Sequence, residues 1–234
     1  FQQNRKSIES FVNYLICFIN FKEMSNDNNL DLHYVQQSFQ RSLKEDDDVI
    51  IEAYIDGYNE LVKFLNLIGT VFSFVSSDVK SKIKVMEKHR EGEHAVYYDS
   101  FQKMMKYEKD TNLHEKSGFV SGSRTMLRLH RGLDFIRLFL KRISEAEDSA
   151  NTCAVCQAAY NETLAEFHPW YIRKAATLAM HALPHRPDLL KKIFGNDESL
   201  TAALAILPQT LSSCDEVYQR VQRLYTEFDF HGLP

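Results

Sequence analysis

The sequence YIDGYNELVKFLNLIGTVFSFVSSDVKSKIKVM, residues 54–86, decides the fold. At helical spacing its apolar side chains form two adjacent stripes: Tyr58, Leu61, Leu65, Ile68, Phe72 and Val75 in one, and Phe64, Leu67, Val71 and Phe74 in the other. A helix that is apolar over so much of its surface must be covered by other helices on more than one side. We therefore predict one long buried helix from Tyr54 to Met86, with Gly57 and Gly69 as its weak points.

Helical periodicity continues along the rest of the chain, and no alternating strand pattern competes with it. The further helices expected are 35–43, 97–107, 126–143, 153–167, 171–183, 188–194, 200–206 and 210–228. Residues 108–123 are polar and are expected to form a long loop. Pro169 interrupts the pattern between two helices, and Trp170 beside it is expected to pack in the core. We predict an all-α fold of about eight helices in packed layers.

Composition and charge are those of a soluble globular domain. The chain has 234 residues, of which 44% are hydrophobic and 26% charged, and its formal net charge of −4 argues against a general nucleic-acid binder. Residues 11–21 are apolar but fall short of the roughly 20 residues that a membrane span needs. We predict an N-terminal extension over residues 1–30, with an extra helix and a polar linker, and one folded domain over 31–234.

The cysteines do not form a recognisable metal or redox motif. Cys153 and Cys156 make a single CxxC pair, whereas a zinc site needs two further ligands. Free thiols in a reducing compartment are the simpler interpretation, and they favour a cytosolic location. No metal and no cofactor are predicted.

Ionisable residues follow directly after the apolar stretch. Asp78 and Lys82 are four residues apart and share a helix face, and so do Arg124 and Arg128. One interpretation is two solvated surface pairs. The other is a cluster at the end of the core that holds an anion. Two like charges at this spacing repel each other, and an anion between them would relieve that repulsion. A phosphate monoester fits the cations, whereas the carboxylate of Asp78 requires a donor such as an amide N–H.

Three blocks of sequence carry a resemblance to a known family. LVKFLNLIGTVFSFVSSDVKSKI, SGSRTMLRLHRGLDFIRLFL and AYNETLAEFHPWYIRKA resemble, in order and separation, the signature blocks of the glycolipid transfer protein family. The resemblance extends from about residue 34 to Pro234. It implies a two-layer helical sandwich that encloses an apolar lipid pocket and holds one sphingolipid.

The resemblance also implies roles for individual residues. Members that carry sugar headgroups have an asparagine where this chain has Lys82, a lysine at Val85 and a tryptophan at Arg128. These changes favour a phosphate headgroup, bound by Lys82, Arg124 and Arg128. By the same resemblance Asp78 accepts from the ceramide amide N–H and a hydroxyl, and His168 donates to the acyl carbonyl. Without the resemblance, a histidine before Pro-Trp is more simply interpreted as a helix cap. The candidates for the apolar pocket lining are Phe72, Phe74 and Phe139.

The implied function is transfer of ceramide-1-phosphate between membranes by a carrier that is not an enzyme. Glycolipid (glycosylceramide) transfer and sphingolipid sensing are the alternatives, and an enzyme or a helical adaptor protein ranks below them. The chain has neither a GxSxG nor an HExxH motif. We expect a cytosolic monomer that makes transient contact with membranes such as those of the Golgi, the plasma membrane and endosomes.

Overall fold

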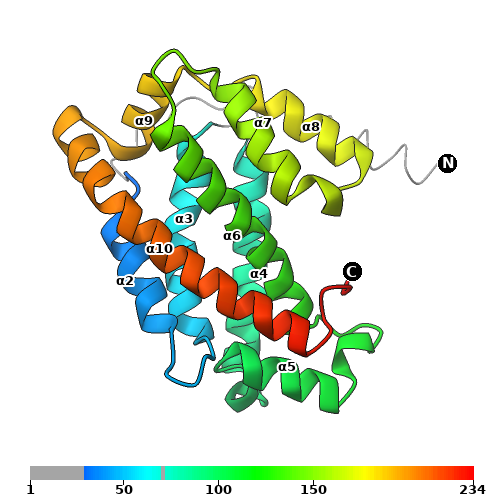
Figure 1. Cartoon of the computed structure of the whole chain (residues 1–234). Helices are drawn as coiled ribbons and strands as arrows, with labels where there is room; N and C mark the ends of the chain where they lie inside the picture. Colours follow the sequence, from blue (N-terminus) through cyan, green and yellow to red (C-terminus); the bar gives the residue numbers. More distant parts are fainter. Residues whose placement is uncertain (1–28, 70–71) are drawn as a thin grey trace.

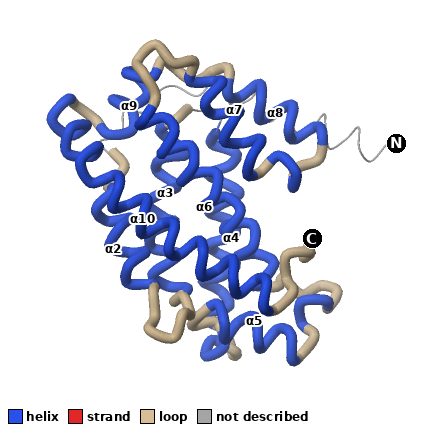
Figure 2. The backbone as a smooth tube through the Cα atoms, in the orientation of Figure 1, coloured by secondary structure: helices blue, strands red, loops and turns tan. Residues whose placement is uncertain are grey.

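The computed structural model describes residues 29–69 and 72–234, so the predicted segment 11–21 and its linker lie outside the described residues. The helices are α2 (Leu32–Ser42), α3 (Ile51–Leu67), α4 (Ser73–Glu91), α5 (Phe101–Asp110), α6 (Gly122–Glu145), α7 (Thr152–Thr163), α8 (Trp170–Met180), α9 (Arg186–Phe194) and α10 (Asp197–Glu227). Short 3-10 turns are present at Ala95–Tyr97, Leu113–Glu115 and Ala165–Phe167. Figure 2 shows helices joined by loops, and the described part of the chain has isolated β-bridges but no strand. The all-α prediction is confirmed.

The helices form two layers (Figure 1). α2, α3 and α4 pack side by side in chain order, and α10, α6 and α7 form the second layer. The layers meet where α10 lies on α2 and where α6 lies on α4. Their facing side chains make one hydrophobic core, whose largest fully buried members include Tyr54, Tyr58, Phe64, Phe101 and Phe139. This arrangement agrees with the predicted helical sandwich.

The apolar stretch that was predicted as one helix is divided in two. α3 ends at Leu67 and α4 begins at Ser73, and Gly69 between them has a φ of 148°. This backbone conformation favours glycine because a Cβ is strained there. Gly57, the other predicted weak point, lies inside α3, where the ring of Phe39 packs so closely that an added Cβ would be 3.0 Å from it. The prediction of a single helix was therefore wrong: the helix breaks at Gly69, one of the two expected weak points, and continues through Gly57, the other.

The final helix continues through a proline. α10 contains Pro208, where we predicted two separate helices, 200–206 and 210–228. A proline inside a helix removes one N–H donor and costs about 3 kcal/mol. Packing offsets this cost, because Leu207 and Thr210 beside the proline are buried and the hydroxyl of Thr210 donates to the carbonyl of Leu32 at 3.1 Å. The two-helix prediction was wrong because tertiary contacts outweigh the local preference.

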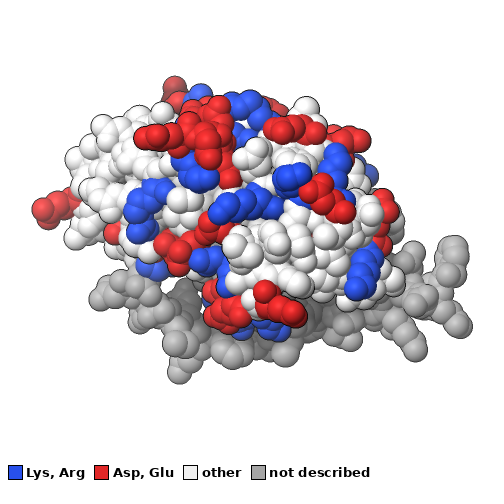
Figure 3. All heavy atoms as spheres, turned by 90° about the horizontal axis from the view of Figure 1, so that it is seen from below, with Lys and Arg blue, Asp and Glu red and all other residues white. Residues whose placement is uncertain are grey.

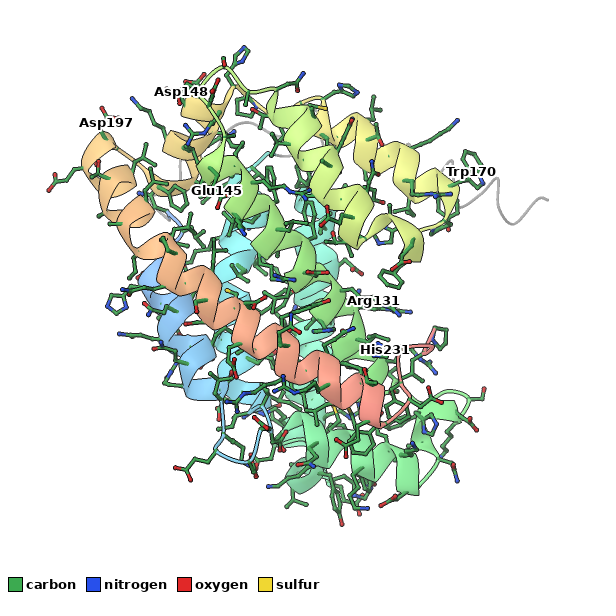
Figure 4. The ribbon with its side chains drawn as sticks, in the orientation of Figure 1. Arg131, Glu145, Asp148, Trp170, Asp197 and His231 are labelled. Carbon is green, nitrogen blue, oxygen red and sulfur yellow. The ribbon has the colours of Figure 1, made fainter. Side chains whose placement is uncertain are left out.

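α8 is the least buried of the long helices. Its only buried residues are Ala179 and Met180 at the C-terminal end, whereas Trp170 is 58% exposed and Leu178 is 69% exposed. Figure 4 shows Trp170 projecting from the beginning of α8 away from the body of the protein. The prediction that Trp170 packs in the core was wrong. The indole instead lies beside Lys174, whose Nζ is 5.3 Å from the ring centroid.

Candidate functional site

The charged pair on α4 lies at the surface of the helix that packs on α6. Val79, Ile83 and Met86 form the buried side of α4, and Asp78 and Lys82 flank it. The Nζ of Lys82 donates to the carboxylate of Asp78 at 2.5 Å. The side chain of Lys82 is only 14% exposed, whereas that of Asp78 is 64% exposed. The ammonium group is therefore held close to the core while the carboxylate faces solvent.

The two arginines lie in the first turns of α6. Ser121 caps this helix, and its hydroxyl accepts from the backbone N–H of Arg124 at 3.1 Å. The guanidinium of Arg124 donates to the carbonyl of His114 at 2.8 Å, and its buried Nε has no acceptor among the described residues. Arg128 is exposed and donates to the backbone oxygen of Pro234 at 3.2 Å. The guanidinium of Arg124 thus rests on a neutral main-chain carbonyl, and that of Arg128 on the C-terminal segment.

The structure brings together the elements of the predicted cation cluster. α4 and α6 are neighbours, as the cluster required. Lys82 is paired with Asp78 on its own helix, while Arg124 and Arg128 are bonded to the loop before α6 and to the C-terminal segment. Arg124 also lines a pocket of about 490 Å³ with Lys109, His114, Phe230 and neighbouring residues of that segment. Joint binding of a phosphate by all three cations remains a prediction.

His168 lies at the turn between α7 and α8. It follows the 3-10 turn Ala165–Phe167 and precedes Pro169, and its backbone is extended, with φ −107° and ψ 134°. Its Nδ1 is 2.8 Å from the hydroxyl oxygen of Tyr160 on α7. Burial lowers the pKa of His168, and the carboxylate of Asp78 opposes that shift. His168 is therefore within the electrostatic reach of Asp78, although the two residues come from different layers.

Arg131 links the His168 turn to the C-terminal segment. Its guanidinium lies 3.8 Å from the ring centroid of Phe167 and donates to the carbonyl of His231 at 2.7 Å. Figure 4 shows Arg131 and His231 at the same edge of the molecule. Burial lowers the pKa of Arg131, and the positive charge of Arg128 acts in the same direction. Cations are thus crowded along this face of α6, with the carboxylate of Glu166 partly compensating.

Glu108, which lies in the predicted loop 108–123, was not identified from the sequence. α5 continues to Asp110, and the side chain of Glu108 is fully buried against the beginning of α6. Its two oxygens accept from Ser121 Oγ at 2.5 Å, Gly122 N at 2.6 Å, and Ser123 N and Tyr98 Oη at 3.1 Å. A carboxylate here neutralises the positive end of the α6 dipole and holds the turn that carries Arg124. A lone acid in a polar stretch gives no periodic signal that could have identified it.

The aromatic residues predicted to line a lipid pocket are largely buried. Phe139 is fully buried and Phe72 is 5% exposed, while Phe74 is half-buried. The ring of Phe139 packs against Phe64 and stacks on Phe135, with centroids 6.1 and 5.9 Å apart. Phe72 and Phe139 belong to the core between the two layers, so a lipid chain would have to part them.

The described residues offer little support for other kinds of site. No group of three His, Cys, Asp or Glu side chains among them is arranged to hold a metal ion, and Cys153 and Cys156 are free thiols. None of the described helices has an apolar stretch long enough to cross a bilayer. Figure 3, which views the molecule from the α5 end, shows basic and acidic side chains interspersed on that face.

Known proteins match this chain over most of its length. Residues 49–195 match the family model described as Glycolipid transfer protein (GLTP). The ceramide-1-phosphate transfer protein of Danio rerio is 42% identical over 207 residues, which cover 87% of this chain and 97% of the relative. The crystal structure of the mouse ceramide-1-phosphate transfer protein in its apo form has 39% sequence identity and a TM-score of 0.82, over 88% of this chain and 100% of that chain.

A second solved structure contains a ligand. Human ceramide-1-phosphate transfer protein in complex with 12:0 ceramide-1-phosphate has 37% identity and a TM-score of 0.80, with 88% of this chain and 100% of that chain covered. These matches, together with the two-layer helical fold, define the class as a lipid carrier and not an enzyme. The chain belongs to the glycolipid transfer protein family.

Proposed function

We propose that this protein carries ceramide-1-phosphate between membranes without covalent chemistry. The observation that carries the proposal is the replacement of sugar-binding residue types by Lys82 and Arg128 on two helices that pack together. The 42% identity to a ceramide-1-phosphate transfer protein over most of the chain supports the same cargo. A neutral sugar headgroup would leave these cations without an anionic partner, which disfavours a glycolipid.

In this proposal the phosphate headgroup replaces the present partners of the three cations. Arg124 exchanges its bond to the carbonyl of His114, and Arg128 its bond to the backbone oxygen of Pro234, for bonds to the anionic phosphate oxygens, which a guanidinium can bind in a bidentate manner. Lys82 turns its ammonium from Asp78 to the phosphate. The carboxylate of Asp78 then accepts from the lipid amide N–H and a hydroxyl, and His168 donates to the acyl carbonyl of the same amide.

The lipid chains are proposed to enter the core between the layers. Each CH₂ exposed to water costs about 0.8 kcal/mol, so a chain of some fifteen carbons costs on the order of 12 kcal/mol unless protein surrounds it. Phe72, Phe74 and Phe139 are the proposed lining. They must separate to admit the chain, since the ring of Phe139 already contacts Phe64 and Phe135.

Contact with a membrane is proposed at α8. Trp170, Tyr171 and Leu178 are exposed on this helix, and Arg173 and Lys174 lie among them. Exposed aromatic side chains with basic neighbours suit the interface of an anionic bilayer, where each basic residue contributes roughly 1 kcal/mol. A single copy of the chain suffices for this contact, so we propose a cytosolic monomer that visits the Golgi, plasma and endosomal membranes transiently.

Transfer assays between vesicles test the cargo. Arg128→Leu is expected to lower the rate of ceramide-1-phosphate transfer by at least tenfold, because a charge-assisted bond contributes about 1.5–3 kcal/mol. Arg142→Leu is the matched control, since Arg142 lies on the same helix but pairs with Glu162 at the surface. Equal ceramide-1-phosphate transfer by the Arg128 variant and the control refutes the headgroup assignment. Stronger competition by a glycosylceramide than by ceramide-1-phosphate would instead identify a glycolipid carrier.

A further inference from the structure

The hydroxyl of Tyr160 lies within hydrogen-bond distance of the imidazole of His168. The oxygen lies 2.8 Å from Nδ1, and the ring centroids are 5.7 Å apart. Tyr160 is in the last turn of α7 and is only 4% exposed. Its ring packs edge-on against Phe135 of α6, at an interplanar angle of 85°. The hydroxyl is therefore held in a fixed position by the core and not by the His168 turn itself.

A neutral imidazole has one donor and one acceptor nitrogen, so the partner of one nitrogen decides the role of the other. Burial lowers the pKa of His168, which keeps the ring neutral near pH 7. Burial also raises the pKa of Tyr160, so its hydroxyl keeps its proton and remains able to donate. When the hydroxyl donates to Nδ1, the single ring hydrogen must be on Nε2. The reverse arrangement would leave Nε2 as an acceptor.

We propose that Tyr160 is a positioning residue, whose O–H donates to Nδ1 of His168 and so fixes the form of the ring in which Nε2–H faces the lipid. This inference rests on the proposed function, in which His168 meets the acyl carbonyl. A carbonyl oxygen only accepts, so an imidazole with an unprotonated Nε2 would repel it. Asp78 only accepts when it is ionised and therefore requires the N–H of the same amide. Tyr160 thus selects lipids that carry an N-acyl group.

Removal of one hydroxyl tests this role. Tyr160→Phe is expected to weaken binding of ceramide-1-phosphate in vesicles by about 2- to 10-fold, the effect of losing one hydrogen bond. Binding of sphingosine-1-phosphate, which has the phosphate but no acyl carbonyl, is expected to stay within twofold. Tyr218→Phe is the matched control, because its hydroxyl donates to Asp134, away from His168. Equal losses for both lipids would overturn the inference.

A double-mutant comparison separates this inference from the proposed function. If Tyr160 acts through His168, then Tyr160→Phe has no further effect on ceramide-1-phosphate binding in a His168→Ala background. An undiminished effect in that background shows that Tyr160 acts through packing, which refutes the inference but leaves the proposed cargo intact. If His168→Ala alone leaves binding unchanged, the assignment of His168 in the proposed function is wrong, and the inference is overturned with it.

Nitrogen NMR of the His168 ring gives a readout that a packing role would not change. The wild-type protein is expected to show an unprotonated Nδ1 and a protonated Nε2 at neutral pH. In Tyr160→Phe the two signals should move toward the average of a ring that exchanges between its two neutral forms. A protonated Nδ1 in the wild-type protein overturns the inference directly, whatever the binding assays give.

Discussion

Replacement of Glu108 by Gln is expected to destabilise the protein at the beginning of α6. Each carboxylate oxygen of Glu108 accepts from one main-chain N–H, that of Gly122 or of Ser123, and from one hydroxyl. A hydroxyl group can rotate its hydrogen away from an amide NH₂, but a main-chain N–H is fixed. Whichever way the glutamine amide is placed, one N–H of α6 faces another donor.

The size of the effect follows from these contacts. A buried donor without an acceptor costs about 1–3 kcal/mol. Loss of the negative charge at the helix N-terminus adds about 0.3–2 kcal/mol. The smaller desolvation cost of a neutral side chain offsets part of this sum. The expected loss in the free energy of unfolding is therefore about 3 kcal/mol, which corresponds to a decrease of roughly 6–12 °C in Tm for a chain of this length.

Urea denaturation followed by circular dichroism measures this loss as a lower midpoint at an unchanged slope. Glu162→Gln is the control, because Glu162 pairs with Arg142 at the surface and its replacement is expected to change stability by less than about 0.5 kcal/mol. If the Glu108 and Glu162 variants unfold at the same urea concentration, the buried carboxylate does not hold the beginning of α6, and the reasoning is refuted.

Two further predictions concern His130 and Arg186. Burial lowers the pKa of His130 to about 4 although Gln222 opposes the shift, so below pH 6.5 the unfolded chain binds a proton that the folded chain does not. The free energy of unfolding should therefore fall by on the order of 3 kcal/mol between pH 6.5 and 4. A His130→Leu variant should lack this decrease. If the free energy of unfolding depends on pH in the same way in both proteins, the prediction is contradicted. Arg186 donates to the last-turn carbonyls of Ile143 and Ser144 at 2.8 Å and to Asp148. Arg186→Met should lower the free energy of unfolding, measured by heat or urea, by about 2–3 kcal/mol, which is more than Arg142→Met should lower it. Equal decreases for the two variants would show that the bonds of Arg186 do not hold the end of α6.

The elements with strong local signals were predictable from the sequence. The apolar period of residues 126–143 identified α6, and the predicted helix 188–194 agrees with the end of α9 at Phe194, where Gly195 follows with φ 94°. Asp78 and Lys82 were expected to share a face of their helix, and their ion pair agrees with that expectation. Such features depend on residues within one or two turns of each other, so periodicity alone finds them.

Features that depend on distant residues were not predictable. Glu108 is buried because α5 happens to end against α6, and Tyr160 meets His168 across a turn that joins two helices. Trp170 was wrongly placed in the core because side-chain size does not report which face of α8 is covered. In each case tertiary packing, and not local preference, decides the outcome.

The neutral partners of the α6 arginines have a kinetic consequence. Arg124 and Arg131 are bonded to carbonyl oxygens, whereas Arg137 on the same helix lies between the carboxylates of Asp134 and Asp215. A carbonyl oxygen accepts a hydrogen bond from a guanidinium group but does not cancel the positive charge of that group. This edge of the molecule therefore keeps a positive field. Arg137 does not contribute to the field, because two carboxylates neutralise it. That field attracts anions from a distance but is screened within about 10 Å at 0.1 M salt. Rising ionic strength should therefore lower the rate at which the protein associates with an anionic surface much more than it raises the rate of dissociation.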